Sequence, residues 1–138
     1  YLAYANLRFK ISPHQCSTPG ISIIVAIRNG QSSIHSLIDS LSAQDYSGPM
    51  EFILVDDESE DQTEDIIRTK TKADSRFVYV SSEIGDNNLK YKKRAIDAGI
   101  RSCSNELLLF TDVDCVLPRT WVSRMVSYFE SGYESYHN

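Results

Sequence analysis

Two aspartates one residue apart, Asp112 and Asp114, directly follow the apolar run Leu107–Phe110 and Thr111. In an extended segment, residues i and i+2 point to the same side, so both carboxylates can reach one ligand. Because like charges repel, a hard divalent ion such as Mg²⁺ or Mn²⁺, with a diphosphate completing its shell, is the usual way to hold them together. Two alternatives stay open: one aspartate accepts a phosphoryl group, or one caps a helix that begins at Pro118 while the other is solvated.

A second acidic pair, Asp56 and Asp57, follows the apolar stretch Glu51–Val55. The next helix can take Ser59 or Asp61 as its N-cap, which leaves the acidic pair without a structural role. Carboxylates at a strand end can accept hydrogen bonds from a nucleobase or a ribose. The structural alternative is an N-cap followed by an acidic first turn, which the helix dipole favours.

Basic residues gather where a third helix is expected to begin. Cations are disfavoured at a helix N-terminus, so a cluster there is more readily explained by an anion that binds nearby. A solvated charged face is the alternative. The residues are Lys90, Lys92, Lys93 and Arg94.

The histidines and cysteines carry no comparable signal. No histidine has a partner at metal-ligand or catalytic-triad spacing, so we expect all three to be structural or exposed. The cysteines are odd in number and lack C-x-x-C spacing, which favours free thiols in a reducing compartment over a zinc site or disulfides. These residues are His14, His35, His137, Cys16, Cys103 and Cys115.

The hydrophobic pattern predicts strands alternating with helices. Continuous β-branched or apolar runs predict buried strands, and apolar residues at helical spacing predict the helices between them. Ser32 or Ser33 is expected to cap the first helix. The predicted strands are Ile21–Ile27, Glu51–Val55, Arg76–Val80 and Glu106–Phe110, and the predicted helices cover 34–41, 60–72, 89–101 and 119–130.

This alternation predicts an α/β fold, a Rossmann-like three-layer α/β/α arrangement with a mainly parallel sheet. In such sheets ligands bind beyond the carboxyl ends of the strands, where both acidic pairs are expected to lie. The 138 residues suffice for one domain, which we divide into a leader, 1–19, and an α/β domain, 20–138. The net charge of −5 disfavours a nucleic-acid partner, and no apolar run is long enough for a membrane helix.

Four blocks in order resemble the glycosyltransferase family 2 domain, the nucleotide-sugar-binding GT-A type. They are "SIIVAIRNG", "FILVDDESEDQTEDIIR", "KKRAIDAGI" and "NELLLFTDVDC", and the likeness runs from Ile21 to about Met125. The resemblance implies inverting transfer of a sugar from a nucleoside-diphosphate donor, with uridine favoured, to an acceptor saccharide or lipid. It also implies Mg²⁺ or Mn²⁺, whose positive charge would neutralise the departing diphosphate.

The resemblance also implies a role for each matching residue. Ala26 and Arg28 would line the nucleobase pocket, and Asp56 and Asp57 would contact the base and ribose. Lys92 would lie near the nucleotide. Asp114 would bind the metal, and Asp112 would bind it too or reach the ribose. These substrate and metal residues are Ala26, Arg28, Asp56, Asp57, Lys92, Asp112 and Asp114.

The chain departs from the family pattern in two places. Asn29-Gly30 stands where Asn-Glu is frequent, and Tyr91 stands where a glycine often precedes the lysine. The general base of this family lies well downstream of the Asp-x-Asp pair, so we expect the sequence to be the donor-binding part of a longer enzyme. The leader and the four blocks resemble those of bacterial cell-envelope members of the family. The resemblance implies a parent protein that carries membrane helices outside this segment and works at the cytoplasmic face of the membrane.

Two rival interpretations remain. A response-regulator receiver would also place an acidic pair after "FILV" and an aspartate after "LLLF". Against it, Ile21–Ile27 precedes that first acidic strand, and Arg76–Val80 lies between the two acidic sites. The other rival is a non-catalytic module that keeps the nucleotide-binding fold without turnover.

Overall fold

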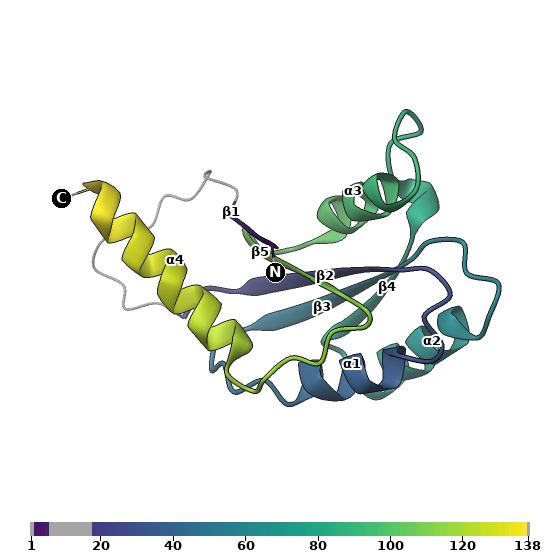
Figure 1. Cartoon of the computed structure of the whole chain (residues 1–138), viewed down its shortest axis with the longest axis horizontal. Coiled ribbons are helices and arrows are strands. Elements are labelled where there is room, and N and C mark those ends of the chain that lie inside the picture. Colours follow the sequence, from purple (N-terminus) through teal and green to yellow (C-terminus); the bar gives the residue numbers. More distant parts are fainter. Residues whose placement is uncertain (1, 6–17, 138) are drawn as a thin grey trace.

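The computed structural model describes residues 2–5 and 18–137, which form one five-stranded sheet with helices on both faces (Figure 1). The strand order is β1-β5-β2-β3-β4, with β1 antiparallel to β5 and the other neighbours parallel. The strands are β1 Leu2–Ala5, β2 Ile21–Ile27, β3 Met50–Asp56, β4 Phe77–Ser81 and β5 Leu107–Asp112. The helices are α1 Ile34–Ser42, α2 Thr63–Ala73, the 3₁₀ turn η1 Ser82–Ile84, α3 Lys92–Ser102 and α4 Trp121–His137.

The alternating side chains of the central strands divide the core into two layers. On one face Ile23, Val25 and Phe52 pack with buried side chains of α1, α2 and α4. On the other face Ile24 and Ile53 pack against α3. Figure 1 shows α3 on one side of the sheet, with α1 and α2 on the opposite side. The predicted three-layer α/β/α fold is therefore confirmed.

Helix α3 approaches the sheet closely because Gly99 presents no side chain to it. A Cβ built at Gly99 would lie 2.5 Å from Ile24 Cγ2 and 3.1 Å from Val55 Cγ2. Ala95 and Ala98, also fully buried on this helix, keep the same contact surface small. This close packing fixes the position of the α3 N-terminus relative to the strand ends.

The observed elements follow the predicted ones with shifts at their ends. Strand β2 has the predicted bounds, whereas β3, β4 and β5 each extend one or two residues further toward the site. Helix α2 begins at Thr63 and α3 at Lys92, each three residues later than expected. Ser33 occupies the N-cap position of α1 but makes no side-chain capping bond.

The last helix was predicted to start at residue 119, and α4 begins two residues later, at Trp121. The segment before it is bound by tertiary contacts to the end of α1. Gln44 Nε2 donates to the Pro118 carbonyl at 2.8 Å, and Val122 N donates to Gln44 Oε1 at 3.0 Å. The buried Gln44 side chain therefore decides where this helix begins.

Part of the predicted leader joins the sheet, since Leu2–Ala5 pairs with β5 from Phe110 to Leu107. Residues 6–17 lie outside the described part of the chain, so the domain boundary near residue 19 stays a prediction. Among the described residues, no helix combines the length and apolarity required to cross a membrane.

Candidate functional site

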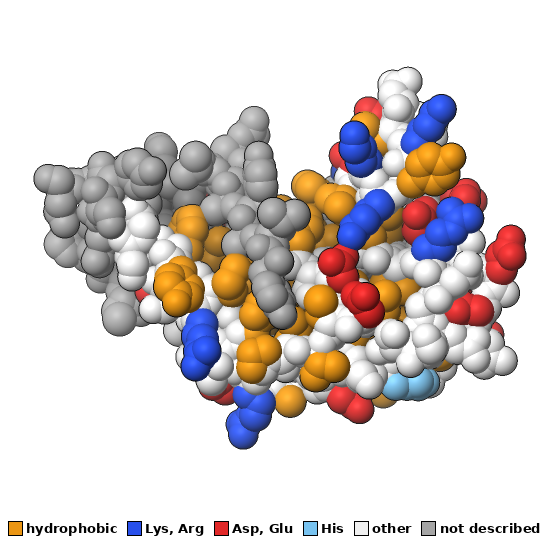
Figure 2. Space-filling view, viewed as in Figure 1, with side chains coloured by type: hydrophobic (Ala, Val, Ile, Leu, Met, Phe, Trp, Pro, Cys, Tyr) orange, Lys and Arg blue, Asp and Glu red, His pale blue; other side chains and the backbone are white. Residues whose placement is uncertain are grey.

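A cavity of about 500 Å³ opens beyond the carboxyl ends of β2, β3 and β5. Its walls combine three carboxylates, two cations, one tyrosine and three apolar residues. Figure 2 shows basic side chains near the start of α3 with acidic side chains directly beside them. The lining residues are Ala26, Ile27, Arg28, Asp57, Tyr91, Lys92, Asp112, Val113 and Asp114.

The parallel register of the sheet brings the acidic pairs together. Ala26 in β2 is the register partner of Asp112 in β5, and Ile27 is the partner of Asp56 in β3. Asp57 N then donates to the Ile27 carbonyl at 2.8 Å, which continues the ladder one residue past the strand. The hydrogen-bond ladders between β2 and its neighbours β3 and β5 thus bring the carboxylates that follow β3 and β5 to one cavity.

The loops after β2 and β3 are bound to each other through Asn29, which has φ of 49°. Asn29 N donates to Ser59 Oγ at 2.9 Å, and Glu60 N donates back to Asn29 Oδ1 at 2.8 Å. Asparagine tolerates this left-handed conformation better than most residues. This reciprocal contact was not predicted from the sequence, although an Asn-Gly pair after a strand is a turn signal that could have pointed to it.

Asp61 and Thr63 extend the same connection into α2. Gly30 N donates to Thr63 Oγ1 at 3.0 Å, and Gln31 N donates to Asp61 Oδ2 at 3.0 Å. Asp61 Oδ1 accepts from Thr63 N at 2.9 Å, so Asp61 does satisfy an N-H in the first turn of the helix. Hydrogen bonds from Thr63, from its hydroxyl above all, lower the pKa of the Asp61 carboxyl. Ser59 and Asp61 therefore hold the wall of the site in place.

The Asp-x-Asp segment forms the group best suited to hold a metal among the described residues. One carboxylate oxygen from Asp112, one from Asp114 and the Cys115 Sγ all lie within 4.8 Å of one another. Both aspartates are exposed, and Cys115 is partly buried against the core. The two oxygens suit Mg²⁺ or Mn²⁺, and a sulfur atom beside them would also suit softer ions. The residues present therefore fit a divalent cation.

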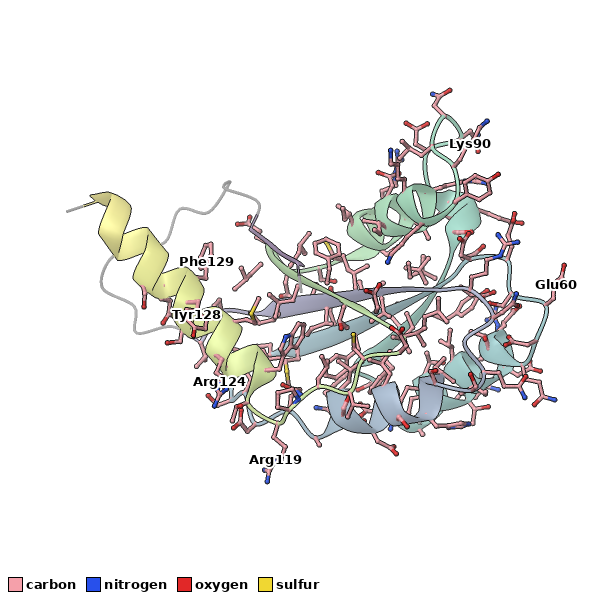
Figure 3. All side chains as sticks on the ribbon, in the orientation of Figure 1. Glu60, Lys90, Arg119, Arg124, Tyr128 and Phe129 are labelled. Carbon is pink, nitrogen blue, oxygen red and sulfur yellow. The ribbon has the colours of Figure 1, made fainter. Side chains whose placement is uncertain are left out.

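The basic cluster divides into separate roles. Lys92 Nζ lies 2.5 Å from Asp112 Oδ1, so this lysine faces the carboxylates. Arg94 instead holds the preceding loop, donating to the Glu83 carbonyl at 2.8 Å and to Asn87 Oδ1 at 3.1 Å. Lys90 stands at the outer tip of that loop (Figure 3). One member of the cluster thus reaches the cavity, and another is structural.

Tyr91 lines the cavity although no role was predicted for it from the sequence. Its backbone has φ of 56° and ψ of −136°, and its side chain is 75% exposed. The Tyr91 carbonyl accepts from Arg94 N at 3.1 Å and Ala95 N at 3.2 Å, so the residue begins α3. The glycine that often stands at this position in the family is the signal that could have pointed to this conformation, because glycine adopts positive φ readily.

Asp56 is placed differently from its neighbour Asp57. Asp56 is only 6% exposed, does not line the cavity, and its buried Oδ1 has no hydrogen-bond partner. Burial raises the pKa of the Asp56 carboxyl, and hydrogen bonds from Ser59 oppose that rise. The cavity thus brings together six of the seven residues that the sequence pointed to, with Asp56 beneath its wall.

The histidines lie apart from this cavity as far as they are described. His35 is an exposed residue of α1. His14 falls outside the described residues, and the side chain of His137 at the end of α4 is likewise not described. Of the cysteines, Cys103 and Cys115 are free thiols, and Cys16 lies outside the described residues.

The family model described as "Glycosyl transferase family 2" matches residues 22–136, most of the chain. The chain belongs to glycosyltransferase family 2. This membership sets aside the response-regulator alternative, as does β4, which lies between the two acidic sites in sequence.

Curated relatives agree with the family membership. The chain is 34% identical over 112 residues to an N-acetylglucosaminyltransferase of Azorhizobium caulinodans, covering 80% of this chain and 27% of that protein. It is 31% identical over 118 residues to an undecaprenyl-phosphate 4-deoxy-4-formamido-L-arabinose transferase of Pseudomonas syringae, covering 83% of this chain and 34% of that protein. The chain therefore spans about a third or less of the length of these relatives.

Solved structures share the fold. The mannosyltransferase PcManGT from Pyrobaculum calidifontis, in complex with GDP-Man and Mn²⁺, superposes with a TM-score of 0.68 at 24% identity, covering 85% of this chain and 34% of that one. S. aureus TarS 1-349 in complex with UDP-GlcNAc superposes with a TM-score of 0.64 at 25% identity, covering 81% of this chain and 31% of that one. The sheet and helices described above are thus those of known glycosyltransferases.

Proposed function

We propose that this glycosyltransferase family 2 domain binds a nucleoside-diphosphate sugar together with Mg²⁺ or Mn²⁺, for transfer of the sugar with inversion. The observation that carries the proposal is the convergence of Asp57, Lys92, Asp112 and Asp114 on one cavity. A nucleotide diphosphate needs an acceptor for its base or ribose, a positive charge for its phosphates and carboxylates for its cation. All three kinds of group lie in this cavity.

The nucleoside end of the donor is assigned to the walls formed by β2 and β3. Ala26 and Arg28 lie on the β2 side, and Asp57 follows β3 with its backbone fixed to the Ile27 carbonyl. The Asp57 carboxylate can accept hydrogen bonds from an N–H of the base or a ribose hydroxyl. Asp56, buried beneath the wall, would act by positioning that loop through Ser59.

The diphosphate end is assigned to the part of the cavity that follows β5. Asp114 and Asp112 would hold the divalent cation, with the Cys115 thiol within reach of the same position. When bound, the cation supplies positive charge for the leaving diphosphate. Lys92, now paired with Asp112, can turn toward the phosphate oxygens and orient them, because its flexible side chain is exposed.

The acceptor side lies beyond what these residues provide. The three carboxylates that line the cavity all have roles toward nucleotide and metal, so we assign the general base to a residue of the longer enzyme. We further propose a saccharide or lipid acceptor, supported by the curated relative whose name specifies undecaprenyl phosphate. Action of the parent protein at the cytoplasmic face of a bacterial membrane stays a prediction of the same kind.

The proposal is tested by calorimetric titration of the 138-residue chain with UDP and with GDP, each with and without Mn²⁺. We expect binding that requires Mn²⁺ and is lost in Asp114→Ala. The matched control is Asp65→Ala, which removes an exposed carboxylate of α2 away from the cavity. Because the Asp114 side chain is exposed, both variants should keep the unfolding temperature of the wild type.

Each outcome has a definite meaning. Metal-dependent binding that survives in Asp114→Ala would contradict the metal assignment. Absence of any nucleotide binding by the wild-type chain would contradict the proposed function. Binding without sugar hydrolysis or transfer in the full-length enzyme would favour the non-catalytic module.

A further inference from the structure

Tyr91 combines a strained backbone with an exposed aromatic ring at the edge of the cavity. A φ of 56° with ψ of −136° belongs to a region that glycine tolerates and bulky side chains avoid. Residues held in such conformations cluster at binding and catalytic sites, where the surrounding structure fixes them. The position therefore carries a conformational cost that a glycine would remove.

Side-chain packing of Tyr91 does not offset the conformational free energy of its strained backbone. The side chain is 75% exposed, and among the side chains that the structure describes its ring stacks on no other ring and its hydroxyl makes no hydrogen bond. The other two residues with positive φ, Asn29 and Glu58, lie in the polar loops after β2 and β3. Of the three, Tyr91 alone places a large flat side chain against the cavity.

The backbone of Tyr91 is firmly held even though its ring is not. Its carbonyl begins α3 by accepting from Arg94 N and Ala95 N. The Arg94 side chain holds the incoming loop through the Glu83 carbonyl and Asn87 Oδ1. The backbone of Tyr91 is thus held at the edge of the cavity, one residue before Lys92, which pairs with Asp112.

We propose that Tyr91 is a donor-binding residue of this chain, whose ring stacks on the nucleobase of the donor; the inference rests on the proposed function. Asp112, Asp114 and Lys92 suit the cation and the diphosphate, and Asp57 suits a hydrogen-bonding edge of the base or ribose. A neutral flat ring suits none of these roles. Among the parts of a nucleotide sugar, the base has the planar face that an aromatic side chain stacks on irrespective of base identity. The exposed ring would then lose its contact with water when the donor binds.

The inference is tested with Tyr91→Gly, Tyr91→Leu and Tyr91→Phe in the 138-residue chain. Affinities for UMP, UDP and UDP-GlcNAc are measured by calorimetry with Mn²⁺, and the unfolding temperature is measured without ligand. We expect Tyr91→Phe to bind like the wild type. Tyr91→Gly and Tyr91→Leu should bind all three ligands on the order of tenfold more weakly, as expected for loss of one stacked ring.

Thermal stability separates this role from a structural one. Because glycine relieves the strain, Tyr91→Gly should unfold at a higher temperature than the wild type while binding more weakly. The matched control is Tyr128→Leu, which changes a similarly exposed tyrosine, 76% accessible, that projects from α4 far from the cavity (Figure 3). This control should bind nucleotides normally.

Other results would overturn the inference in distinguishable ways. If the wild type binds UDP and the Tyr91→Gly and Tyr91→Leu variants bind it equally well, Tyr91 is not part of the site. The proposed function would still stand. Weakening confined to UDP-GlcNAc would assign the ring to the sugar and reject the base. A lower unfolding temperature of Tyr91→Gly would make the residue structural, and a wild type that binds no nucleotide would reject the function and the inference together.

Discussion

Lys92 and Asp112 form an ion pair between the start of α3 and the end of β5, with Nζ 2.5 Å from Oδ1. The two side chains are 62% and 55% exposed, so the pair contributes little to folding, at most about 1 kcal/mol. Its consequence is local, because a lysine neutralises one of the two carboxylates that would hold the cation. In the proposed site the lysine and the metal would therefore compete for Asp112 until a diphosphate offers Lys92 another partner.

Replacement of Lys92 by methionine should separate metal binding from nucleotide binding. Without the ammonium group, Asp112 and Asp114 would attract Mn²⁺ alone several-fold more tightly, whereas UDP would bind several-fold more weakly in the presence of Mn²⁺. Manganese titration followed by electron paramagnetic resonance and UDP calorimetry measure the two effects. The exposed neighbour Lys93→Met is the matched control, and a Lys92→Met variant that weakens both kinds of binding would contradict the competition.

Removal of the Asp57 carboxylate should weaken nucleotide binding even without metal. Asp57 lines the cavity on the β3 side, whereas the aspartates suited to the metal follow β5. We expect Asp57→Ala to lower UDP affinity about tenfold or more, as for loss of a hydrogen bond to a charged acceptor. Calorimetry with and without Mn²⁺ measures it, with Glu60→Ala, which removes a side chain that points outward (Figure 3), as the control. An unchanged affinity would return Asp57 to a structural role.

Substitution of Gly30 by alanine should lower the stability of the fold and weaken Mn²⁺ binding. A Cβ at Gly30 would lie 2.5 Å from Ile27 Cγ2 and 3.0 Å from Val113 Cγ2, and Val113 is the residue between the two metal-site aspartates. Because Ile27 is buried, relief of this overlap should cost about 1–3 kcal/mol of unfolding free energy. The shift of Val113 should also weaken Mn²⁺ binding.

The matched control for that change is Gly132→Ala in α4. A Cβ there meets nothing within 4 Å, and alanine favours a helix interior over glycine by about 1 kcal/mol. Chemical denaturation of both variants checks the contrast. Equal stability of Gly30→Ala and the wild type would mean that the loop has room to move.

Asp56 should make the folded state less stable as the pH rises. Burial raises its pKa from the ordinary 3.8, so the folded state holds this proton at pH values where the unfolded state has released it. The stability that the protonated form provides is complete below 3.8 and is lost as the pH rises through the higher folded-state value. We therefore expect Asp56→Asn to be more stable than the wild type near pH 7, with the difference shrinking toward acid.

Urea unfolding of both proteins from pH 4 to pH 7 measures this dependence. The exposed Asp39→Asn of α1 is the control, and its difference from the wild type should stay nearly constant with pH. If the difference in unfolding free energy between Asp56→Asn and the wild type does not change with pH, Asp56 ionises as freely in the folded state as in the unfolded one.

The strands were predictable because their signal is local. Five of the seven residues of Ile21–Ile27 are β-branched, and a strand buried on both faces needs little else to define its bounds. The helix starts were less predictable, since they depend on partners far away in sequence. Thr63 begins α2 where Asp61 and Gly30 engage it, and Trp121 begins α4 where Gln44 binds the preceding segment.

The sequence by itself determined that two acidic pairs follow parallel strands, because alternating strands and helices put such residues at one edge of a sheet. Only the tertiary structure decided which of the adjacent Asp56 and Asp57 faces the cavity, since Asp56 is still paired with both neighbouring strands and Asp57 lies just beyond β3. The same holds for Lys92 and Asp112, 20 residues apart, and for the strained Tyr91 beside them. Those contacts arise from the packing of α3 on the sheet, which no local pattern encodes.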